Sequence, residues 1–600
     1  MKKNFFQLTY WKPTVLPFEL KNWYAVIMLV ALGLLAYGLC LSTPALFSDD
    51  WAMAVRWNIE DTWQCPNWMQ TRPLRACYDV MLYQAFGLNI FAFYIVTIIV
   101  NILIAIAFYF ILDDLLPSNF RLFNIIVAAL FLIYPSDYTH GWLAATSVKF
   151  PVLLFLISFL LLIYFWRRGW WWLWGASMLL LLISLGFYEL HVGLVLLSSS
   201  ILFWLARDRP LNHRLAILTP LIIVILFVFW FMFGTKLVGI VQIYSSDLVT
   251  ISPQIVIPRM ISGYRISLQW AWTEALLYFF PGLTNYSSRT NLNATIVFVL
   301  IPLLVVVLAS YVARRIYSTD SLGINSTKVK QWEAITGFAS IGLIGLAIIG
   351  AGYIPVISAF DVWVDYDISR YNSLASIGAA LVICSLLAIL ATYLSHTGRQ
   401  ATFIFLAGIL PFVTLALCAQ LSVQQTRLVA WQQQKSILYQ LFQLAPNLKD
   451  DTGVYIFASS YPKTLGPRPF TDGGLGLGMT SALTMLYGNN SLHGLFHYGD
   501  PSKYFTKEGI IREGLGLILG NPSPTPKPDP TSKVPLVDVP VLIPYEHVVI
   551  FEYQPQNGQL TLLKKLPADW VSELGFNPDL GLDQIITAPS PDTHLRWLVK

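Results

Sequence analysis

Two adjacent carboxylates, Asp49 and Asp50, directly follow a long apolar run that begins near Trp23. A charged side chain at the centre of a bilayer costs roughly 2.5–3.5 kcal/mol, so the pair is expected at the water boundary of a membrane helix. Carboxylates commonly take or donate the proton when a bond to a sugar forms or breaks. The pair therefore indicates acid–base chemistry at a membrane surface. The alternative interpretation is that it caps the N-terminus of a short helix.

Basic residues form a second group that could take part in chemistry. Arg72 and Arg370 are the first candidates for binding a phosphate group, because the planar guanidinium binds phosphate through two parallel hydrogen bonds. Arg75, Lys149 and Arg259 are further candidates. The alternative for each one taken singly is a cation that extends from a helix end to the membrane interface.

Three further polar residues lie at predicted external ends of helices. Asp137, His140 and Glu189 could line a cavity for an acceptor substrate. For each of them the alternative is a helix end in contact with water. All of these candidates require helices that bring them to one side of a membrane, and the composition predicts such helices.

The composition is that of a polytopic membrane protein. Hydrophobic residues make up 56% of the 600 residues, and charged residues make up only 12%, whereas about 25% of the residues of a soluble protein are charged. The mean hydropathy is +0.60. The net charge of +5 is modest, and no basic run with interleaved aromatic residues is present, so a nucleic-acid partner is not predicted.

The apolar runs predict an all-α membrane domain with about 11 spanning helices, since roughly 20 apolar residues cross a bilayer. A further apolar stretch at 264–281 contains Arg265, Gln269 and Glu274 and is predicted to be a juxtamembrane or re-entrant helix. The spanning runs lie at 23–43, 88–112, 121–135, 149–166, 170–187, 190–206, 215–233, 294–313, 334–355, 371–394 and 401–422.

Lysines and arginines are concentrated in the segments on the N-terminal side of the membrane. By the positive-inside rule, this bias predicts a multi-pass protein of the plasma (inner) membrane with a cytoplasmic N-terminus. The loop that holds Asp49 and Asp50 then lies outside.

Cys65 and Cys77 fall in the same loop and could pair if the loop faces an oxidising space, while free buried thiols are the alternative.

Two domains are predicted. Residues 1–422 form the transmembrane domain, with one external loop at 44–87 that carries the acidic pair and another at 234–293. An odd number of spans leaves residues 423–600 outside the membrane. Their more polar composition and their length predict a soluble α/β domain, which we expect to hold or recognise the acceptor.

Several local patterns in this soluble domain can be interpreted. Residues 454–458 are predicted to form a buried strand and residues 547–563 a hairpin. The glycine-rich run 474–479 fails the dinucleotide-binding pattern, because a methionine occupies the last glycine position. His493 and His497 have metal-ligand spacing, but the sequence offers no obvious third ligand. No domain for a nucleotide sugar is therefore predicted.

The order of motifs along the membrane domain adds a resemblance. After the acidic pair come a tryptophan-rich stretch at 51–68, the segment Thr71-Arg72-Pro73-Leu74 and a span. This layout resembles the GT-C glycosyltransferases, the polytopic family that includes protein O-mannosyltransferases and lipid A aminoarabinose transferases. The proline-containing segment 134–142, Glu189 between later spans, and Ser369-Arg370-Tyr371 at the head of a span are similar to further elements of that family.

The resemblance covers about residues 20–420. It implies a transferase that takes a sugar from a polyprenyl-phosphate carrier and passes it to a glycan, lipid or protein by an inverting displacement. In this scheme Asp49 is the general base, and Asp50 orients the acceptor or holds a divalent metal, Mg or Mn. The chain has Asp-Asp where the aminoarabinose and mannosyl enzymes usually carry Asp-Glu. The sugar and the acceptor are therefore not specified.

Other classes of function remain open at this stage. An oligosaccharide ligase or oligosaccharyltransferase would move a whole glycan from a lipid-diphosphate donor. A transporter would show repeated halves and charges at the bilayer midplane, whereas the candidate charges here lie at helix ends. A non-catalytic membrane scaffold would display the C-terminal domain and would be indifferent to loss of the two aspartates.

Overall fold

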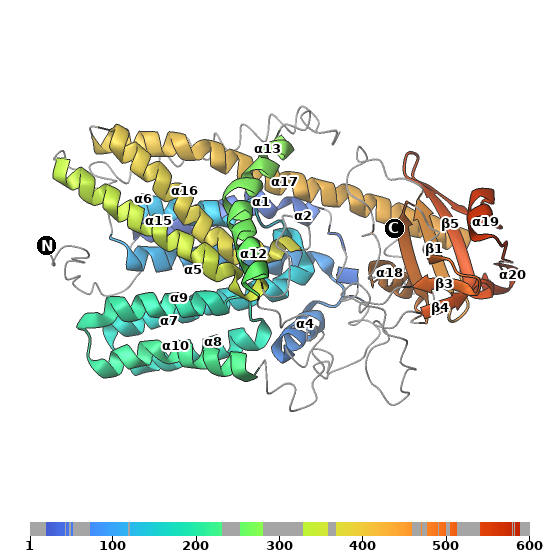
Figure 1. Cartoon of the computed structure of the whole chain (residues 1–600), viewed down its shortest axis with the longest axis horizontal. Coiled ribbons are helices and arrows are strands. Elements are labelled where there is room, and N and C mark those ends of the chain that lie inside the picture. The colour runs from blue at the N-terminus through green and yellow to red at the C-terminus, as the bar shows by residue number, and fades with distance from the viewer. Residues whose placement is uncertain are drawn as a thin grey trace.

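The computed structural model has two parts, a long bundle of helices and a small domain with a β-sheet at one end of it (Figure 1). The prediction of a mostly helical membrane domain followed by a C-terminal α/β domain is confirmed in this coarse form. The structure describes residues 20–42, 44–46, 50–51, 54, 72–117, 120–230, 252–279, 328–357, 368–395, 397–458, 470, 477–489, 491–499, 504–512, 541–578, 580 and 582–587.

Several predictions concern residues outside these ranges. They include Asp49, Cys65, the predicted span at 294–313 and most of the predicted external loop at 234–293. The other cysteine of the predicted pair, Cys77, is in a disulfide.

The helices of the first part follow the predicted apolar runs. In the described ranges, six helices are long and apolar enough to cross a membrane and three more are apolar but shorter, so a multi-pass protein is confirmed while the count of 11 is not. The first half comprises α1 (Leu20–Tyr37), α2 (Leu39–Ser42), α4 (Pro73–Phe86), α5 (Ile90–Leu115), α6 (Arg121–Leu132), α7 (Thr146–Arg168), α8 (Trp171–Phe187), α9 (Val192–Leu205) and α10 (Leu211–Phe229). The second half comprises α12 (Pro253–Arg265), α13 (Ala271–Phe279), α15 (Lys328–Ile357), α16 (Ser373–Leu394) and α17 (Gly398–Leu444).

Small residues allow these helices to pack closely. In a bilayer a helix satisfies its own backbone groups, and helices associate through close van der Waals packing rather than through a hydrophobic driving force. Where α15 meets α16, a Cβ atom added to Gly378 would lie 2.3 Å from the carbonyl oxygen of Gly345. This contact between backbones is possible only because both positions are glycine.

The predicted juxtamembrane helix at 264–281 is part of a longer helical segment. A π-helical turn, η7 (Ile266–Trp270), joins α12 to α13. Figure 1 shows this segment crossing the long helices instead of running along them, and it packs against α15, α16 and α17. This course differs from that of the spanning helices, as the internal charges of the stretch suggested.

The last helix of the bundle, α17, continues into the C-terminal domain. It is 47 residues long and runs from the far end of the bundle to the sheet (Figure 1). The predicted domain boundary at 422/423 falls inside it, so a continuous helix connects the two parts.

The C-terminal domain contains a four-stranded sheet in the order β2-β1-β5-β6. Strand β1 (Gly453–Ala458) is parallel to β2 (His493–Tyr498) and to β5 (Val548–Gln554), and β5 pairs antiparallel with β6 (Gln559–Leu562). The strand and the hairpin predicted from the sequence are both present. A helix, α18 (Leu477–Tyr487), packs on β2, and a separate pair joins β3 (Gly509–Arg512) to β4 (Val541–Pro544). Two short helices, α19 (Ala568–Leu574) and α20 (Leu582–Ile585), complete the domain.

Candidate functional site

The connection between α6 and α7, residues 133–145, contacts Asp50, the described member of the acidic pair. Asp50 is 1% exposed, and its Oδ1 accepts a hydrogen bond of 2.8 Å from the backbone N–H of Ala144 in this loop. Asp49 lies outside the described residues. The Ala144 amide therefore holds the Asp50 carboxylate in place. The role that the family resemblance implies for Asp50, orienting the acceptor or holding a divalent metal, stays a prediction.

Arg72 forms an ion pair with Glu189. The Arg72 Nε donates a hydrogen bond of 3.0 Å to Glu189 Oε2, and Nη2 donates to Oε1. Arg72 occupies the position before Pro73, the first residue of α4, where the missing N–H of proline costs nothing. Burial alone would raise the pKa of the Glu189 carboxyl, but the adjacent Arg72 guanidinium outweighs this and lowers that pKa below its usual value. Glu189 is therefore an ionised partner of Arg72.

Two tyrosines bring the predicted phosphate-binding arginines together. The Arg72 guanidinium lies 3.9 Å from the centroid of the Tyr188 ring, and that of Arg75 lies 5.9 Å from it. Arg370 lies 5.1 Å from the ring of Tyr371, whose hydroxyl bonds with that of Tyr188. We call Arg72, Arg75 and Arg370 the arginine cluster. Within the described part of the chain, Glu189 forms an ion pair with one member of the cluster, Arg72.

The α6–α7 loop connects the arginine cluster to Asp50. The guanidinium of Arg370 lies 5.2 Å from the centroid of the Trp142 ring. Two positions further along the chain, Ala144 donates its N–H to Asp50. Two residues of the same loop thus contact a cation that suits phosphate, Arg370, and a carboxylate of the acidic pair, Asp50.

Asp137 has a different position from the one predicted for a residue lining an acceptor cavity. It is fully buried, and it pairs with the ammonium group of Lys149. Its Oδ1 also accepts hydrogen bonds from the N–H and the hydroxyl of Thr139, at 2.9 and 2.6 Å. Burial alone would raise the pKa of Asp137, but Lys149 and then His140 lower it to about 2. Lys149, a further phosphate candidate, therefore acts here as the counter-ion of Asp137.

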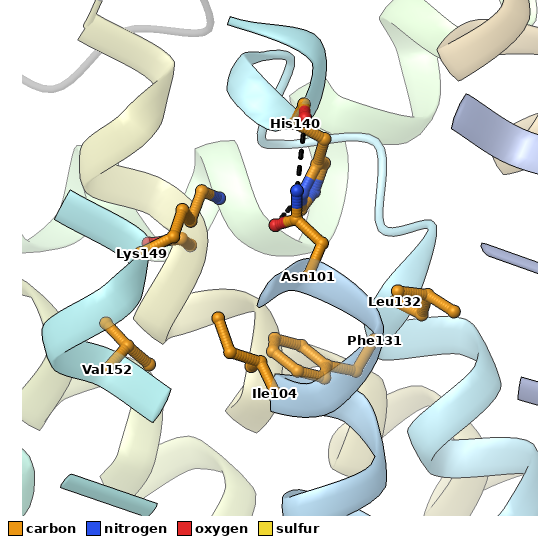
Figure 2. Close-up of a pocket in the computed structure, with 8 residues that line it drawn as sticks. Asn101, Ile104, Phe131, Leu132, His140, Lys149 and Val152 are labelled. Atoms are coloured by element: carbon orange, nitrogen blue, oxygen red, sulfur yellow. Dashed lines mark hydrogen bonds between the residues drawn. The ribbon is translucent and has the colours of Figure 1, made fainter. Parts of the chain in front are cut away.

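His140 lies next to this pair and beside a small cavity. Its Nδ1 lies 3.0 Å from Asn101 Oδ1, and its backbone carbonyl accepts a hydrogen bond of 3.1 Å from Asn101 Nδ2. Figure 2 shows Asn101, His140 and Lys149 around the cavity, which Ser373 also lines and which has room for about one water molecule. Burial, followed by the charge of Lys149, lowers the pKa of His140 to about 3, so the imidazole is neutral at physiological pH.

Arg259, another phosphate candidate, has a structural contact. Its Nη1 donates a hydrogen bond of 3.0 Å to the carbonyl oxygen of Ile357, the last residue of α15. A cation at this position satisfies a helix-end carbonyl and interacts favourably with the helix dipole. This contact supports the alternative interpretation of Arg259.

The described residues do not form a metal site. Among them, no group of three or more histidine, cysteine, aspartate or glutamate side chains could hold a metal ion. Asp50 is the one member of the acidic pair inside the described ranges, and one of its oxygens already accepts the Ala144 N–H. We therefore derive no step that uses a metal.

The chain was compared with known proteins at the levels of sequence and structure. No family model and no curated protein matches it. The solved structures that are similar to it include two of ArnT from Cupriavidus metallidurans. The structure bound to undecaprenyl phosphate has a TM-score of 0.35 and 13% identity, over 78% of this chain and 88% of that chain. The structure in the apo state has a TM-score of 0.30 and 16% identity, over 74% and 84%.

ArnT is an aminoarabinose transferase of the GT-C type, the family whose motifs the sequence resembles. At these TM-scores the superposition transfers no residue's role to this chain.

Sequence reasoning missed the contacts made by α17. Trp51, next to Asp50, is fully buried, and its indole Nε1 donates a hydrogen bond of 3.3 Å to Gln434 Oε1. Arg427 donates one of 2.6 Å to the carbonyl oxygen of Tyr138. A signal existed in the sequence, because Gln420, Gln424, Arg427, Trp431 and Gln434 follow a 4-3-4-3 spacing that places residues on one helix face.

Proposed function

We propose that this chain is an integral membrane glycosyltransferase. It takes a sugar from a polyprenyl-phosphate donor and transfers it to a hydroxyl group of a glycan, lipid or protein on the external face of the plasma membrane. The observation that carries this proposal is the pair of contacts on the α6–α7 loop, Arg370 over Trp142 and Asp50 at Ala144. They support a site in which a phosphate-binding group adjoins a carboxylate, as transfer from a sugar phosphate requires.

The arginine cluster binds the donor. Arginine donates two parallel hydrogen bonds to phosphate oxygens, and its charge stabilises the phosphate as it leaves. The position of three guanidinium groups beside Tyr188 and Tyr371 supports this role. The polyprenyl chain remains in the lipid next to the apolar helices.

The acidic pair activates the acceptor. Asp49 removes the proton of the acceptor hydroxyl while its oxygen attacks the anomeric carbon. The bond from that carbon to the phosphate oxygen breaks, and its electron pair stays on the phosphate. Because the nucleophile enters opposite the leaving group, the anomeric configuration inverts. Asp50 keeps its hydrogen bond with Ala144 and thereby holds Asp49 in place.

The orientation follows from the charge bias of the loops. With the N-terminus in the cytoplasm, the acidic pair and the C-terminal domain face outside. Nucleotide sugars are not supplied there, so a lipid-linked donor fits the site. The C-terminal domain holds the acceptor near the membrane.

The proposal is tested in cells that carry Asp49→Asn together with Asp50→Asn in place of the native gene. Surface glycans and lipid-linked glycans are compared by mass spectrometry with those of the parent strain, at equal amounts of the protein in the membrane. We expect one sugar to disappear from a surface polymer or protein while its lipid-linked precursor accumulates. An accumulating lipid diphosphate that carries a whole glycan would instead identify a ligase.

A matched control uses Asp208→Asn, since Asp208 is an exposed aspartate distant from the acidic pair in the chain. This variant should leave the glycan profile unchanged. If the double variant of the acidic pair also leaves it unchanged while deletion of the gene alters it, the aspartates are not catalytic and the scaffold interpretation is favoured.

A further inference from the structure

One face of α17 contacts the α6–α7 loop, the end of the first helix and the residue next to Asp50. The residues on this face are 2–4% exposed although most of them are polar. A buried polar side chain needs a hydrogen-bond partner, so each residue on the face holds another segment in place. We call this set the α17 stripe; it consists of Gln420, Gln424, Arg427, Trp431 and Gln434.

The first part of the stripe holds the α6–α7 loop. Gln420 Nε2 donates hydrogen bonds of 3.1 and 3.0 Å to the carbonyl oxygens of Tyr134 and Asp137. About two helical turns further on, Arg427 donates to the carbonyl oxygen of Tyr138. The loop that contacts Arg370 and Asp50 is therefore bonded to α17 at three backbone carbonyls.

The middle of the stripe holds the end of the first helix. Gln424 Oε1 accepts a hydrogen bond of 3.2 Å from the N–H of Cys40 in α2. Its Nε2 donates to the carbonyl oxygen of Ala36 in α1. The segment from which the chain continues to the acidic pair is thus fixed against the same helix.

The last part of the stripe holds the residue next to the acidic pair. The Trp51 indole donates to Gln434, and its ring centroid lies 5.9 Å from that of Trp431. About 9 Å further along the helix, Gln440 contacts the C-terminal sheet. Its Nε2 donates to the Gly558 carbonyl at 2.7 Å, and its Oε1 accepts from the Leu560 N–H at 2.8 Å.

We infer that Gln434 is a positioning residue for the acidic pair, and that α17 sets the distance between this pair and the C-terminal domain. The inference rests on the proposed function. Gln434 touches neither donor nor acceptor; it fixes Trp51, and Trp51 fixes the adjacent carboxylates. The same helix is bonded to the β5–β6 hairpin through Gln440. The distance between the acidic pair and an acceptor held by the C-terminal domain is therefore constant.

The test uses Gln434→Met, which keeps the length of the side chain and removes the hydrogen-bond acceptor. We expect at least a tenfold loss of the sugar product per amount of membrane protein, measured by mass spectrometry of the glycans. Gln434→Glu restores the acceptor oxygen and should recover most of the product. The control Gln432→Met changes an exposed glutamine two positions away on the same helix and should have no effect.

Two further measurements separate positioning from a general loss of structure. Binding of undecaprenyl phosphate alone, measured by native mass spectrometry of the purified full chain, should change less than twofold in Gln434→Met, since the arginine cluster is intact. Trp51→Phe removes the other partner of the hydrogen bond. Both variants remove the same hydrogen bond. The double variant should therefore lose no more product than the more strongly affected single variant.

The outcomes distinguish the inference from the proposed function. If Asp49→Asn abolishes the product but Gln434→Met does not lower it, the inference is wrong and the proposed function stands. If neither variant alters any glycan, the proposed function fails as well. If Gln434→Met does not fold, Trp51→Phe decides the question, and a normal product level in that variant overturns the inference.

Discussion

Arg72 and Glu189 lie 117 positions apart in the chain and form a two-point ion pair, with Arg72 Nε at 3.0 Å from Glu189 Oε2. The pair joins the N-terminus of α4 to the segment after α8. The Arg72 guanidinium also lies over the Tyr188 ring, 3.9 Å from its centroid. A phosphate that binds to Arg72 must therefore share this guanidinium with a carboxylate.

The first prediction concerns the charges of this pair. Arg72→Gln should weaken the binding of undecaprenyl phosphate about tenfold or more, because a hydrogen bond to a charged group contributes about 1.5–3 kcal/mol. Glu189→Gln should strengthen binding, because it removes a competing negative charge. Native mass spectrometry of the purified chain measures both, with the exposed Arg168→Gln as control. Equal affinities for all three variants would exclude Arg72 from the donor site.

The second prediction concerns the buried pair of Asp137 and Lys149. Asp137→Asn should lower the free energy of unfolding by about 3–5 kcal/mol, because it leaves the Lys149 ammonium without its counter-ion in the interior. The double variant Asp137→Asn with Lys149→Met should recover much of the loss. Thermal unfolding of the detergent-purified variants measures both effects. A double variant no more stable than the single one would show that the ion pair is not the cause.

The third prediction is the pH dependence of the same pair. The pKa of Asp137 is lowered to about 2 in the folded protein, from about 3.9 in an unfolded chain. Because the folded pKa is the lower one, the stabilisation is fully present above about pH 4 and is lost as the pH falls toward 2. The difference in melting temperature between the native chain and the double variant should therefore be constant from pH 5 to 8 and shrink below pH 4. A difference that already shrinks at pH 6 would refute this assignment.

The fourth prediction concerns Arg370. Its planar guanidinium lies over the rings of Trp142 and Tyr371, at 5.2 and 5.1 Å. Lysine keeps the charge but has neither the planar shape nor the two-point geometry. Arg370→Lys should therefore weaken undecaprenyl phosphate binding about as much as Arg370→Gln does. If lysine supports normal binding, only the charge at this position matters.

The fifth prediction concerns the contact between α15 and α16. Gly378→Ala places a Cβ atom 2.3 Å from a backbone oxygen of Gly345, and overpacking of this kind costs about 1–3 kcal/mol. Gly337→Ala is the matched control on α15, because no atom lies within 4 Å of the added Cβ. The melting temperature should fall for the first variant only. Equal melting temperatures would mean that the two helices can separate at no cost.

The helices and strands were largely predictable from local chemistry. The apolar run at 371–394 corresponds to α16, and the predicted strand at 454–458 corresponds to β1. Apolar runs form helices in a bilayer because no other partner exists for their backbone groups. The continuation of α17 past residue 422 was not predictable in this way. A helix that leaves the lipid loses its apolar composition there but keeps its backbone hydrogen bonds.

The candidate site was predictable in its residue types but not in its pairings. Arg72 and Arg370 were each predicted as phosphate-binding candidates, and the structure places both near Tyr188. Asp137 was expected beside an acceptor, but it is buried against Lys149. The partner of a charged residue depends on which helices become neighbours, and residue spacing within one helix carries no information on that.

By itself the sequence determined that this is a multi-pass membrane protein with a C-terminal α/β part, and that an acidic pair follows the first apolar run. Only the tertiary structure decided that Gln434 holds Trp51 across 383 positions of the chain and that one loop connects Asp50 to Arg370. The physical reason is the solvent. In a bilayer the face of a helix that touches lipid is as apolar as the face that touches protein, so the apolar pattern marks a span but not its neighbours.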